Sequence, residues 1–235
     1  MRNRLMNSVL AGAAAAVLLP AVFARPAGQS SGASSATQDS ARDLSGVWLV
    51  DHFHPNLLPF VKAPLTPDGE AKYKKADINV NDPNLACLPQ GIPRMMFVPL
   101  PIEVFQVPGK VLIYGEAGNE LRQIYLDRQH PADADETYNG DSIGKWDGNT
   151  LVVDTNGFND ITWIDHVGLP HSTDLHVVER IHRVDHDTLE DDFMIEDPKT
   201  YTKPWTATQL YKLKPGWEIK EYVCSNNKYT YKPEK

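Results

Sequence analysis

Turn-forming residues recur roughly every eight to twelve positions from Asp43 onward, and this spacing limits the possible folds more than any other feature of the chain. The segments between the turns alternate polar and apolar residues, or consist of β-branched and aromatic residues, which is the pattern of β-strands. No stretch of the sequence has the apolar spacing of a long amphipathic helix. The sequence therefore predicts an all-β domain built as a meander.

We expect about nine strands, most of them joined to the next by a short turn. Turn signals are strong at 147–149, 185–187 and 215–216, and Pro108-Gly109 is expected to close a hairpin. The expected strands are 44–50, 102–107, 111–114, 121–127, 150–155, 175–184, 188–195, 205–213 and 217–224.

About nine strands in one small domain have to close or stack, because a long open sheet leaves edges that pair with other chains. We expect an antiparallel meander that closes into a barrel of about 8–10 strands. A two-layer sandwich is the alternative, since alternation along a strand does not report closure. One helix is predicted, at 66–75, with Thr66 as its cap and Pro67 at its first position.

The N-terminus has the features of a secretory signal peptide. Arg2 and Arg4 precede an apolar run rich in Ala and Leu, and Ala24 is a small residue suited to cleavage. A membrane anchor is the alternative, but the run is shorter than the ~20 residues of a spanning helix, and Pro20 interrupts it. The small polar residues that follow predict a disordered leader. We expect a signal peptide at 1–24, a leader at 25–42, a single β-barrel domain at 43–235 and a periplasmic or secreted product.

The charge of the chain excludes several classes of partner. Loss of the two arginines in the signal peptide takes the formal net charge from −8 to −10. An acidic surface repels nucleic acid and anionic lipid, so we expect neither nucleic-acid binding nor membrane insertion after cleavage. No glycine-rich phosphate loop is followed by a helix, and we expect no nucleotide cofactor.

The two cysteines are far apart in the sequence, at Cys87 and Cys224. A disulfide is the expected state of such a pair in an exported chain. A two-thiolate metal site is the alternative, but neither cysteine has a second ligand at finger-like spacing.

The segment Leu44-Ser45-Gly46-Val47-Trp48 resembles the Gly-x-Trp opening of lipocalin-like (calycin) barrels. In that superfamily a tryptophan near the first strand plugs one barrel end, and a central cavity holds small hydrophobic ligands. Some calycin relatives are enzymes, phenolic acid decarboxylases among them, but no residue here matches their active sites one for one. The segments GNTLVVDT, ERIHRVDHDTLEDDF and EDPKTYTKPW also resemble a group of exported bacterial proteins to which no activity is assigned.

Five of the eight histidines lie between positions 166 and 186. His166, His171 and His176 are spaced five apart, which differs from the i, i+4 pair of a zinc-binding helix and alternates faces on a strand. A metal site is the alternative, because loop residues can fold together and three aspartates lie close by. We expect no metal.

A buried carboxylate is predicted on the strand at 175–184. Alternation places Glu179 on the same face as three aliphatic residues, where desolvation would raise its pKa toward the range of a general acid or base. Arg122 shares a face with two apolar neighbours and is its expected partner. An internal salt bridge without chemistry is the alternative.

The loop at 160–174 combines aromatic, acidic and histidine residues with Gly and Pro, which is typical of a lid at a barrel mouth. His171 follows a proline and directly precedes the strand, so its imidazole is expected at the rim. A surface histidine bonded to Asp174 or water is the alternative. Trp48, Trp146 and Trp217 are expected to pack in the core.

Together these features predict an exported enzyme that carries out cofactor-independent acid/base chemistry on a hydrophobic or aromatic small molecule in the barrel cavity. A lyase or isomerase, decarboxylase-like chemistry included, is the expected class. A lipocalin-type periplasmic binding protein without catalysis is one alternative, and a structural or inhibitor module without an enclosed cavity is another. The expected catalytic residues are His171, Glu179 and Tyr125, and the expected substrate-binding residues are Arg122, Trp163, Tyr201 and His54.

Overall fold

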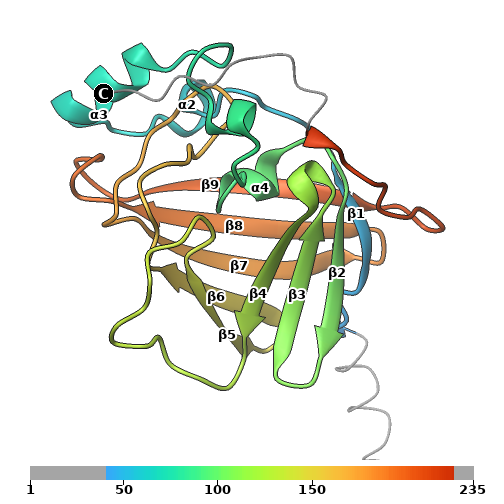
Figure 1. Cartoon of the computed structure of the whole chain (residues 1–235). Helices are drawn as coiled ribbons and strands as arrows, with labels where there is room; N and C mark the ends of the chain where they lie inside the picture. Colours follow the sequence, from blue (N-terminus) through green and yellow to red (C-terminus); the bar gives the residue numbers. More distant parts are fainter. Residues whose placement is uncertain (1–40, 225–235) are drawn as a thin grey trace, which may run out of the picture.

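The computed structural model describes residues 41–224, and within them nine strands form a closed barrel (Figure 1). Each strand pairs with the next in the sequence, and the last pairs with the first, which closes the barrel and confirms that prediction. The strands are β1 (Gly46–Val50), β2 (Ile102–Val107), β3 (Lys110–Gly115), β4 (Glu120–Tyr125), β5 (Asp141–Asp147), β6 (Thr150–Asn156), β7 (His176–Asp185), β8 (Thr188–Glu196) and β9 (Trp205–Leu213).

One pair of neighbouring strands is parallel, so the prediction of an entirely antiparallel meander was wrong at that point. In β4 and β5, Ile124 lies opposite Ser142 and Tyr125 lies opposite Ile143 in a parallel register. Residues 126–140 connect the two strands, and a connection longer than a hairpin turn lets β5 begin at the same end as β4.

The strand β5 was missed in the sequence because its inward-facing positions are small. Ser142 and Gly144 are buried there, and a glycine within a short polar segment resembles a turn. A Cβ on Gly144 would lie 2.8 Å from a methyl group of Ile124, so the close approach of β4 excludes a larger residue. Packing against the neighbouring strand, rather than local pattern, therefore makes this segment a strand.

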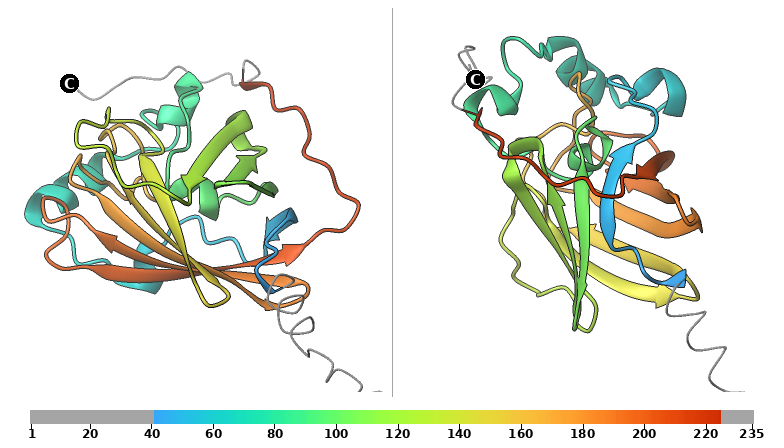
Figure 2. Two further views of the ribbon diagram at one scale, coloured as in Figure 1. Left: turned by 90° about the horizontal axis from the view of Figure 1, so that it is seen from below. Right: turned by 90° about the vertical axis from the view of Figure 1, so that its right-hand side faces the viewer.

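The strand expected at 217–224 does not form. Its residues have no strand assignment and run over the outside of the barrel as the red segment in Figures 1 and 2. Both neighbours of β9 are already β8 and β1, so the closed barrel leaves no edge on which this segment could pair. Trp217 is accordingly 51% exposed, and its expected place in the core was wrong.

A helical segment between β1 and β2 lies over one side of the barrel (Figures 1 and 2). Thr66 caps α3 by accepting a hydrogen bond from the Gly69 amide at 3.1 Å, and Pro67 is the first helical residue, as the sequence predicted. The segment contains α2 (Leu58–Val61), α3 (Pro67–Lys75), η1 (Pro83–Ala86) and α4 (Arg94–Phe97). One further short helix, η2 (Ala117–Asn119), lies between β3 and β4.

Side chains fill the barrel interior. Trp48 is fully buried in it, as expected, and Trp146 is half-buried against the core. The hollow between Leu44, Ile113 and Leu189 has a volume of about 10 Å³, which is room for a single water molecule. The ligand cavity that was expected at the centre of the barrel is therefore a packed core in the described residues.

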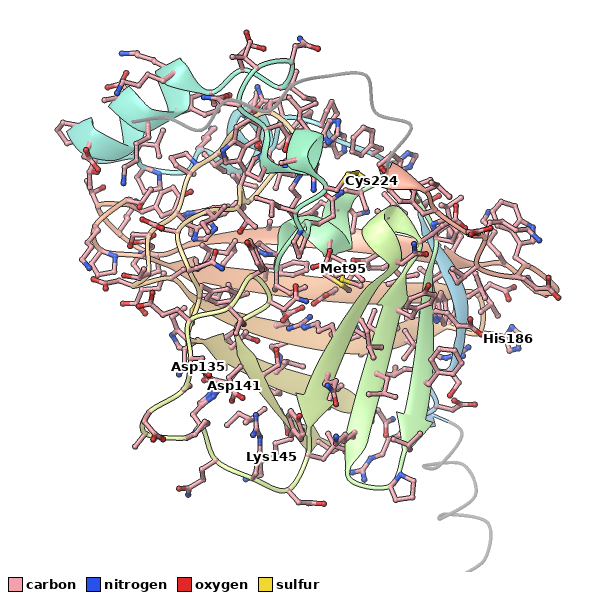
Figure 3. All side chains as sticks on the ribbon, in the orientation of Figure 1. Met95, Asp135, Asp141, Lys145, His186 and Cys224 are labelled. Carbon is pink, nitrogen blue, oxygen red and sulfur yellow. A yellow bond between two sulfur atoms is a disulfide. The ribbon has the colours of Figure 1, made fainter. Side chains whose placement is uncertain are left out.

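Cys87 and Cys224 form the expected disulfide, with their Cα atoms 5.7 Å apart. The bond joins the end of η1 to the C-terminal segment (Figure 3). Because disulfides persist in oxidising compartments, the bond indicates an exported protein. The expected signal peptide and nearly all of the expected leader lie outside the described residues, as do residues 225–235 of the expected domain.

Candidate functional site

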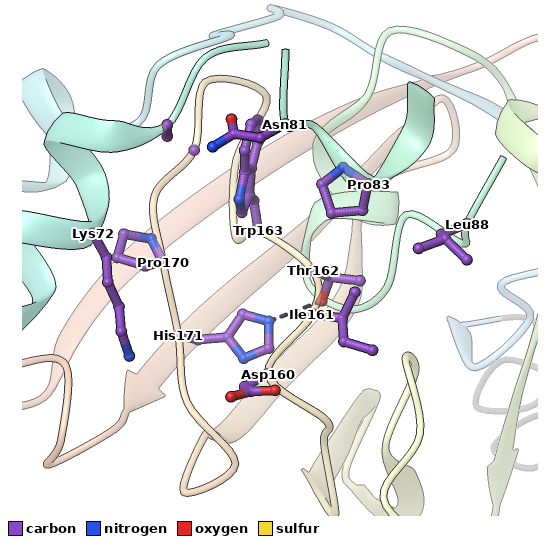
Figure 4. A pocket seen from close by; sticks show the side chains of 12 residues that line it. Lys72, Asn81, Pro83, Leu88, Asp160, Ile161, Thr162, Trp163, Pro170 and His171 are labelled. Carbon is purple, nitrogen blue, oxygen red and sulfur yellow. Dashed lines mark hydrogen bonds between the residues drawn. The ribbon is translucent and has the colours of Figure 1, made fainter. Parts of the chain in front are cut away.

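A pocket with a volume of about 430 Å³ lies between α3 and the loop at 157–175 (Figure 4). Its apolar lining includes Ile161, Trp163 and Leu88. The polar and charged lining residues are Lys72, Asn81, Asp160, Thr162 and His171. The volume lies in the range of small-molecule sites, and the mixture of apolar walls with a few polar groups is typical of them.

His171 is held in one orientation by two hydrogen bonds. Its Nε2 lies 2.8 Å from the Thr162 hydroxyl, and its Nδ1 lies 3.2 Å from the Ser172 carbonyl oxygen. A carbonyl can only accept, so Nδ1 carries the proton and the neutral Nε2 accepts from Thr162. The imidazole is 2% exposed, so His171 is buried in the pocket wall and not held at an exposed rim as expected.

The protonation state of His171 is set mainly by burial. Desolvation lowers its pKa below the ordinary histidine value, because the charged imidazolium loses its hydration in the wall. The carboxylates of Asp197 and Asp160 oppose this shift, and the Lys72 ammonium reinforces it. The ring is therefore a neutral proton acceptor at neutral pH.

Three buried side chains, those of Asp165, Asp197 and Tyr201, fix the loop that carries His171. The carboxylate of Asp165 accepts hydrogen bonds from the amides of Leu57, Val167 and Leu169, which ties the loop to the helical segment. This inward carboxylate satisfies amides that would otherwise be buried without partners. Its bonds define the loop on the N-terminal side of His171.

On the C-terminal side, Asp197 accepts from both the amide and the hydroxyl of Ser172, at 2.6 and 2.8 Å. The buried phenol of Tyr201 donates to the Pro170 carbonyl at 2.7 Å, and burial raises the pKa of Tyr201 well above its ordinary value. The loop that carries the imidazole is therefore held by Asp165, Asp197 and Tyr201, none of which lines the pocket.

The four residues expected to bind substrate lie in different places. Trp163 lines the pocket, with the Arg94 guanidinium 5.5 Å from its ring centre. Tyr201 is a support behind the pocket wall, as described above. His54 is exposed and stacks on Phe60 with their ring centres 4.2 Å apart, and it does not line the pocket.

Arg122 and Glu179 meet inside the barrel and do not line the pocket. The guanidinium donates to both carboxylate oxygens, at 2.7 and 2.5 Å, and also to the hydroxyls of Ser142 and Thr155. The expected partnership of the two residues is confirmed. Their contact is the internal salt bridge that the sequence analysis gave as the alternative. The pair lies inside the barrel, whereas His171 lines the pocket outside it.

Tyr125 lies on the outer face of β4, opposite to the face that carries Arg122. Its ring contacts the Lys110 ammonium at 4.5 Å and the Arg128 guanidinium at 3.6 Å. The structure therefore does not bring Tyr125 together with His171 in a common cavity.

Sequence reasoning missed a buried ion pair behind the pocket. Arg94 donates to both oxygens of Asp82, at 2.8 and 2.7 Å, and a further contact of 3.3 Å links its guanidinium to Nδ1 of His166. Burial, and then the charge of Arg94, lower the pKa of His166. The aspartate before Pro83 was a visible helix-cap signal, but nothing in the sequence indicated that Arg94 is its partner.

The remaining histidines of the rich stretch do not join His171. His176 bonds to Asp154 at 3.0 Å, and the same carboxylate oxygen also contacts His130 at 3.0 Å. His182 is half-buried beside Glu190, and His186 is exposed in its turn. In residues 41–224 no group of three or more His, Cys, Asp or Glu side chains is arranged to hold a metal ion.

Comparison with known proteins gives no relative: no family model, no curated protein and no solved structure matches this chain. Within the described range no helix is long and apolar enough to cross a membrane.

Proposed function

We propose that this chain is an enzyme, exported to the periplasm or outside the cell, that transfers a proton to or from a small hydrophobic or aromatic molecule without a cofactor. The observation that carries the proposal is the pair of bonds on His171, from Thr162 to Nε2 and from Nδ1 to Ser172. They fix the tautomer in which Nε2 is the basic atom and Nδ1 carries the proton. A lyase or isomerase, decarboxylase-like chemistry included, is the reaction class that needs only such a group.

The chemistry follows from the protonation state of the ring. Neutral His171 takes a proton from the substrate, either directly at Nε2 or through the Thr162 hydroxyl, which passes its own proton to Nε2 and receives the substrate's. The imidazolium that forms is stabilised by the carboxylates of Asp197 and Asp160, whose charges favour the protonated ring. Return of the proton to another atom completes an isomerisation, and departure of a leaving group completes an elimination.

The walls of the pocket set the kind of molecule that fits. Trp163 and Ile161 offer flat apolar surface, and the volume of about 430 Å³ suits a compact ligand of drug-like size or less. We assign the reaction to this pocket instead of the barrel interior, because the interior is packed.

A lipocalin-like relationship of the barrel remains part of the proposal, supported by strand closure and by the buried Trp48 of the first strand.

Hydrogen–deuterium exchange tests the proposal without knowledge of the natural substrate. A panel of aryl ketones and arylacetates is incubated with the protein in deuterated water, and loss of the C–H signal next to the carbonyl group is followed by proton NMR. We expect the wild type to accelerate exchange in some members of the panel and His171→Gln to abolish that exchange. His182→Gln, the same change on β7 away from the pocket, is the matched control and should retain the rate.

A second variant keeps the test independent of folding defects in His171→Gln. Thr162→Val preserves the side-chain shape and removes the hydroxyl bonded to Nε2, so it should change the exchange rate. Loss of the buried bond costs about 1–3 kcal/mol, so the rate is measured at a temperature where circular dichroism shows the variant to be folded. Exchange at the wild-type rate in His171→Gln would contradict the proposal.

One observation favours a binding protein without catalysis as the second candidate. Both ring nitrogens of His171 already have partners within the protein, which is also the state of a structural histidine. This candidate predicts saturable quenching of the Trp163 fluorescence by an apolar ligand that is recovered unchanged. Trp163→Phe should remove the quenching, and formation of a product would exclude the candidate.

A further inference from the structure

Lys72 brings a positive charge to the pocket from the helix that covers it. It lies on α3 and is one of the pocket-lining residues, whereas Lys74 and Lys75 of the same helix are not. Its ammonium pairs with Asp68 at 3.2 Å, one turn earlier on the exposed side of the helix. Such exposed pairs are weak, so Lys72 can exchange this partner for an anion in the pocket at little cost.

Lys72 and Asp160 place opposite charges around His171. In Figure 4 the lysine side chain runs beside Pro170, and the Asp160 carboxylate lies beside the imidazole. The two charges act on the ring in opposite directions, since Lys72 disfavours and Asp160 favours its protonated form. Both charges therefore lie close enough to the ring for a small ligand to reach them.

The remaining lining suits the apolar part of such a ligand. Trp163 and Ile161 supply an aromatic and an aliphatic surface, and Leu88 and Pro83 extend it. The guanidinium of Arg94 contacts the ring of Trp163, but both of its terminal nitrogens are already bonded to Asp82. Arg94 is thus a support for the wall, and Lys72 is the cation in the lining.

We propose that the pocket takes a small apolar carboxylate, an aromatic carboxylate above all, whose carboxylate group binds the Lys72 ammonium. The apolar body then lies against Trp163, which leaves the atoms next to the carboxylate facing His171. This inference rests on the function proposed above and names its substrate class. The substrate-binding role that was expected of Arg122 falls to Lys72, because Arg122 is enclosed in the barrel with Glu179.

Binding measurements with paired probes test the substrate class. Benzoate, phenylacetate and cinnamate are each compared with the corresponding uncharged amide by isothermal titration calorimetry at low ionic strength. We expect the wild type to bind at least one carboxylate more tightly than its amide, and Lys72→Gln to weaken the carboxylate roughly tenfold or more while leaving the amide unchanged. Lys74→Gln removes a charge from the same helix outside the pocket and should leave both affinities as they are.

The outcomes separate this inference from the proposed function. If Lys72→Gln binds the carboxylates as tightly as the wild type does, the carboxylate inference is wrong, while binding in the pocket and exchange dependent on His171 still support the proposed function. An equal loss of carboxylate and amide binding in Lys72→Gln would show that Lys72 shapes the pocket and would also overturn the inference. Failure of all six probes to bind the wild type would contradict the inference and weaken the proposed function with it.

Discussion

Arg122 and Glu179 form a two-bond ion pair that is entirely enclosed in the barrel, with exposed side-chain fractions of 1% and 0%. The Arg122 guanidinium also donates from Nε and Nη2 to the Ser142 hydroxyl and from Nη2 to the Thr155 hydroxyl. Removing two charges from water is costly unless their polar atoms are hydrogen-bonded, and here all three guanidinium nitrogens and both carboxylate oxygens have partners. The pair is therefore part of the barrel interior, and the proposed chemistry lies outside the barrel at His171.

Loss of one member of this pair should be strongly destabilising. Arg122→Met leaves the Glu179 carboxylate buried without its partner, and we expect the free energy of unfolding to fall by about 3–5 kcal/mol. Urea denaturation followed by tryptophan fluorescence measures the change. The double variant Arg122→Met with Glu179→Met should recover most of the loss, and a double variant as unstable as the single one would contradict this account.

The buried carboxyl of Asp191 should make the protein more stable in mild acid. No donor among the described residues reaches either of its oxygens, and burial and the charge of Glu179 raise its pKa well above the ordinary value. A carboxyl with a raised folded-state pKa contributes its full stability below its unfolded pKa, and that stability is lost as pH rises toward the folded pKa.

Asp191→Asn keeps the shape of the protonated carboxyl and cannot ionise. We expect it to increase the free energy of unfolding at neutral pH by about 1–3 kcal/mol and to flatten the pH dependence above the ordinary aspartate pKa. Thermal unfolding from pH 4 to pH 8 measures both effects. Asp127→Asn, the same change at an exposed position that does not act on Asp191, is the control and should keep the wild-type slope.

His171 should remain neutral at a pH where an exposed histidine is protonated. Its lowered folded-state pKa means that the stability it contributes is present above the unfolded pKa of about 6.5 and is lost as pH falls through the folded pKa. NMR titration of the imidazole ring protons should place the midpoint of His171 below about 6.5, the value of an unperturbed histidine. A midpoint above 6.5 would contradict the burial argument.

The disulfide should be a major source of stability. It joins residues separated by 137 positions, and closing a loop of that length corresponds to about 4–5 kcal/mol in the chain-entropy model. Cys87→Ser, Cys224→Ser and the reduced wild type should all unfold at a similar, lower urea concentration. Unchanged midpoints would show that release of the bond does not increase the conformational entropy of the unfolded chain, and would contradict this prediction.

The sequence predicted eight of the observed strands because they alternate polar and apolar residues, or consist of β-branched and aromatic residues, between clear turn signals. It failed at β5, where Ser142 and Gly144 occupy those positions, and at 217–224, where alternation exists but no strand edge is free. In both segments the available partner, and not the local pattern, decides the conformation. Period-two alternation shows which side chains share one face of a strand. The segment forms a strand only where a neighbouring strand is available to pair with it.

The candidate site divides in the same way. Alternation was enough to place Glu179 and Arg122 inside the barrel, and two cysteines in an exported chain were enough to predict their bond. The same alternation put Tyr125 on the outer face, yet its role was assigned without regard to that face. Lys72 and Thr162 had no sequence signal, because each is an ordinary residue in its own segment.

The sequence by itself thus determined most of the β-strands, the cap of α3, the inward positions of Arg122 and Glu179, and the disulfide, since each depends on a periodic pattern or on the chemistry of a few residues. Only the tertiary structure decided that the barrel core is packed and that the pocket lies beneath α3. The physical reason is that a pocket is made by segments distant in the chain, here α3 and the loop of His171, and their approach depends on buried contacts such as those of Asp165 and Asp197.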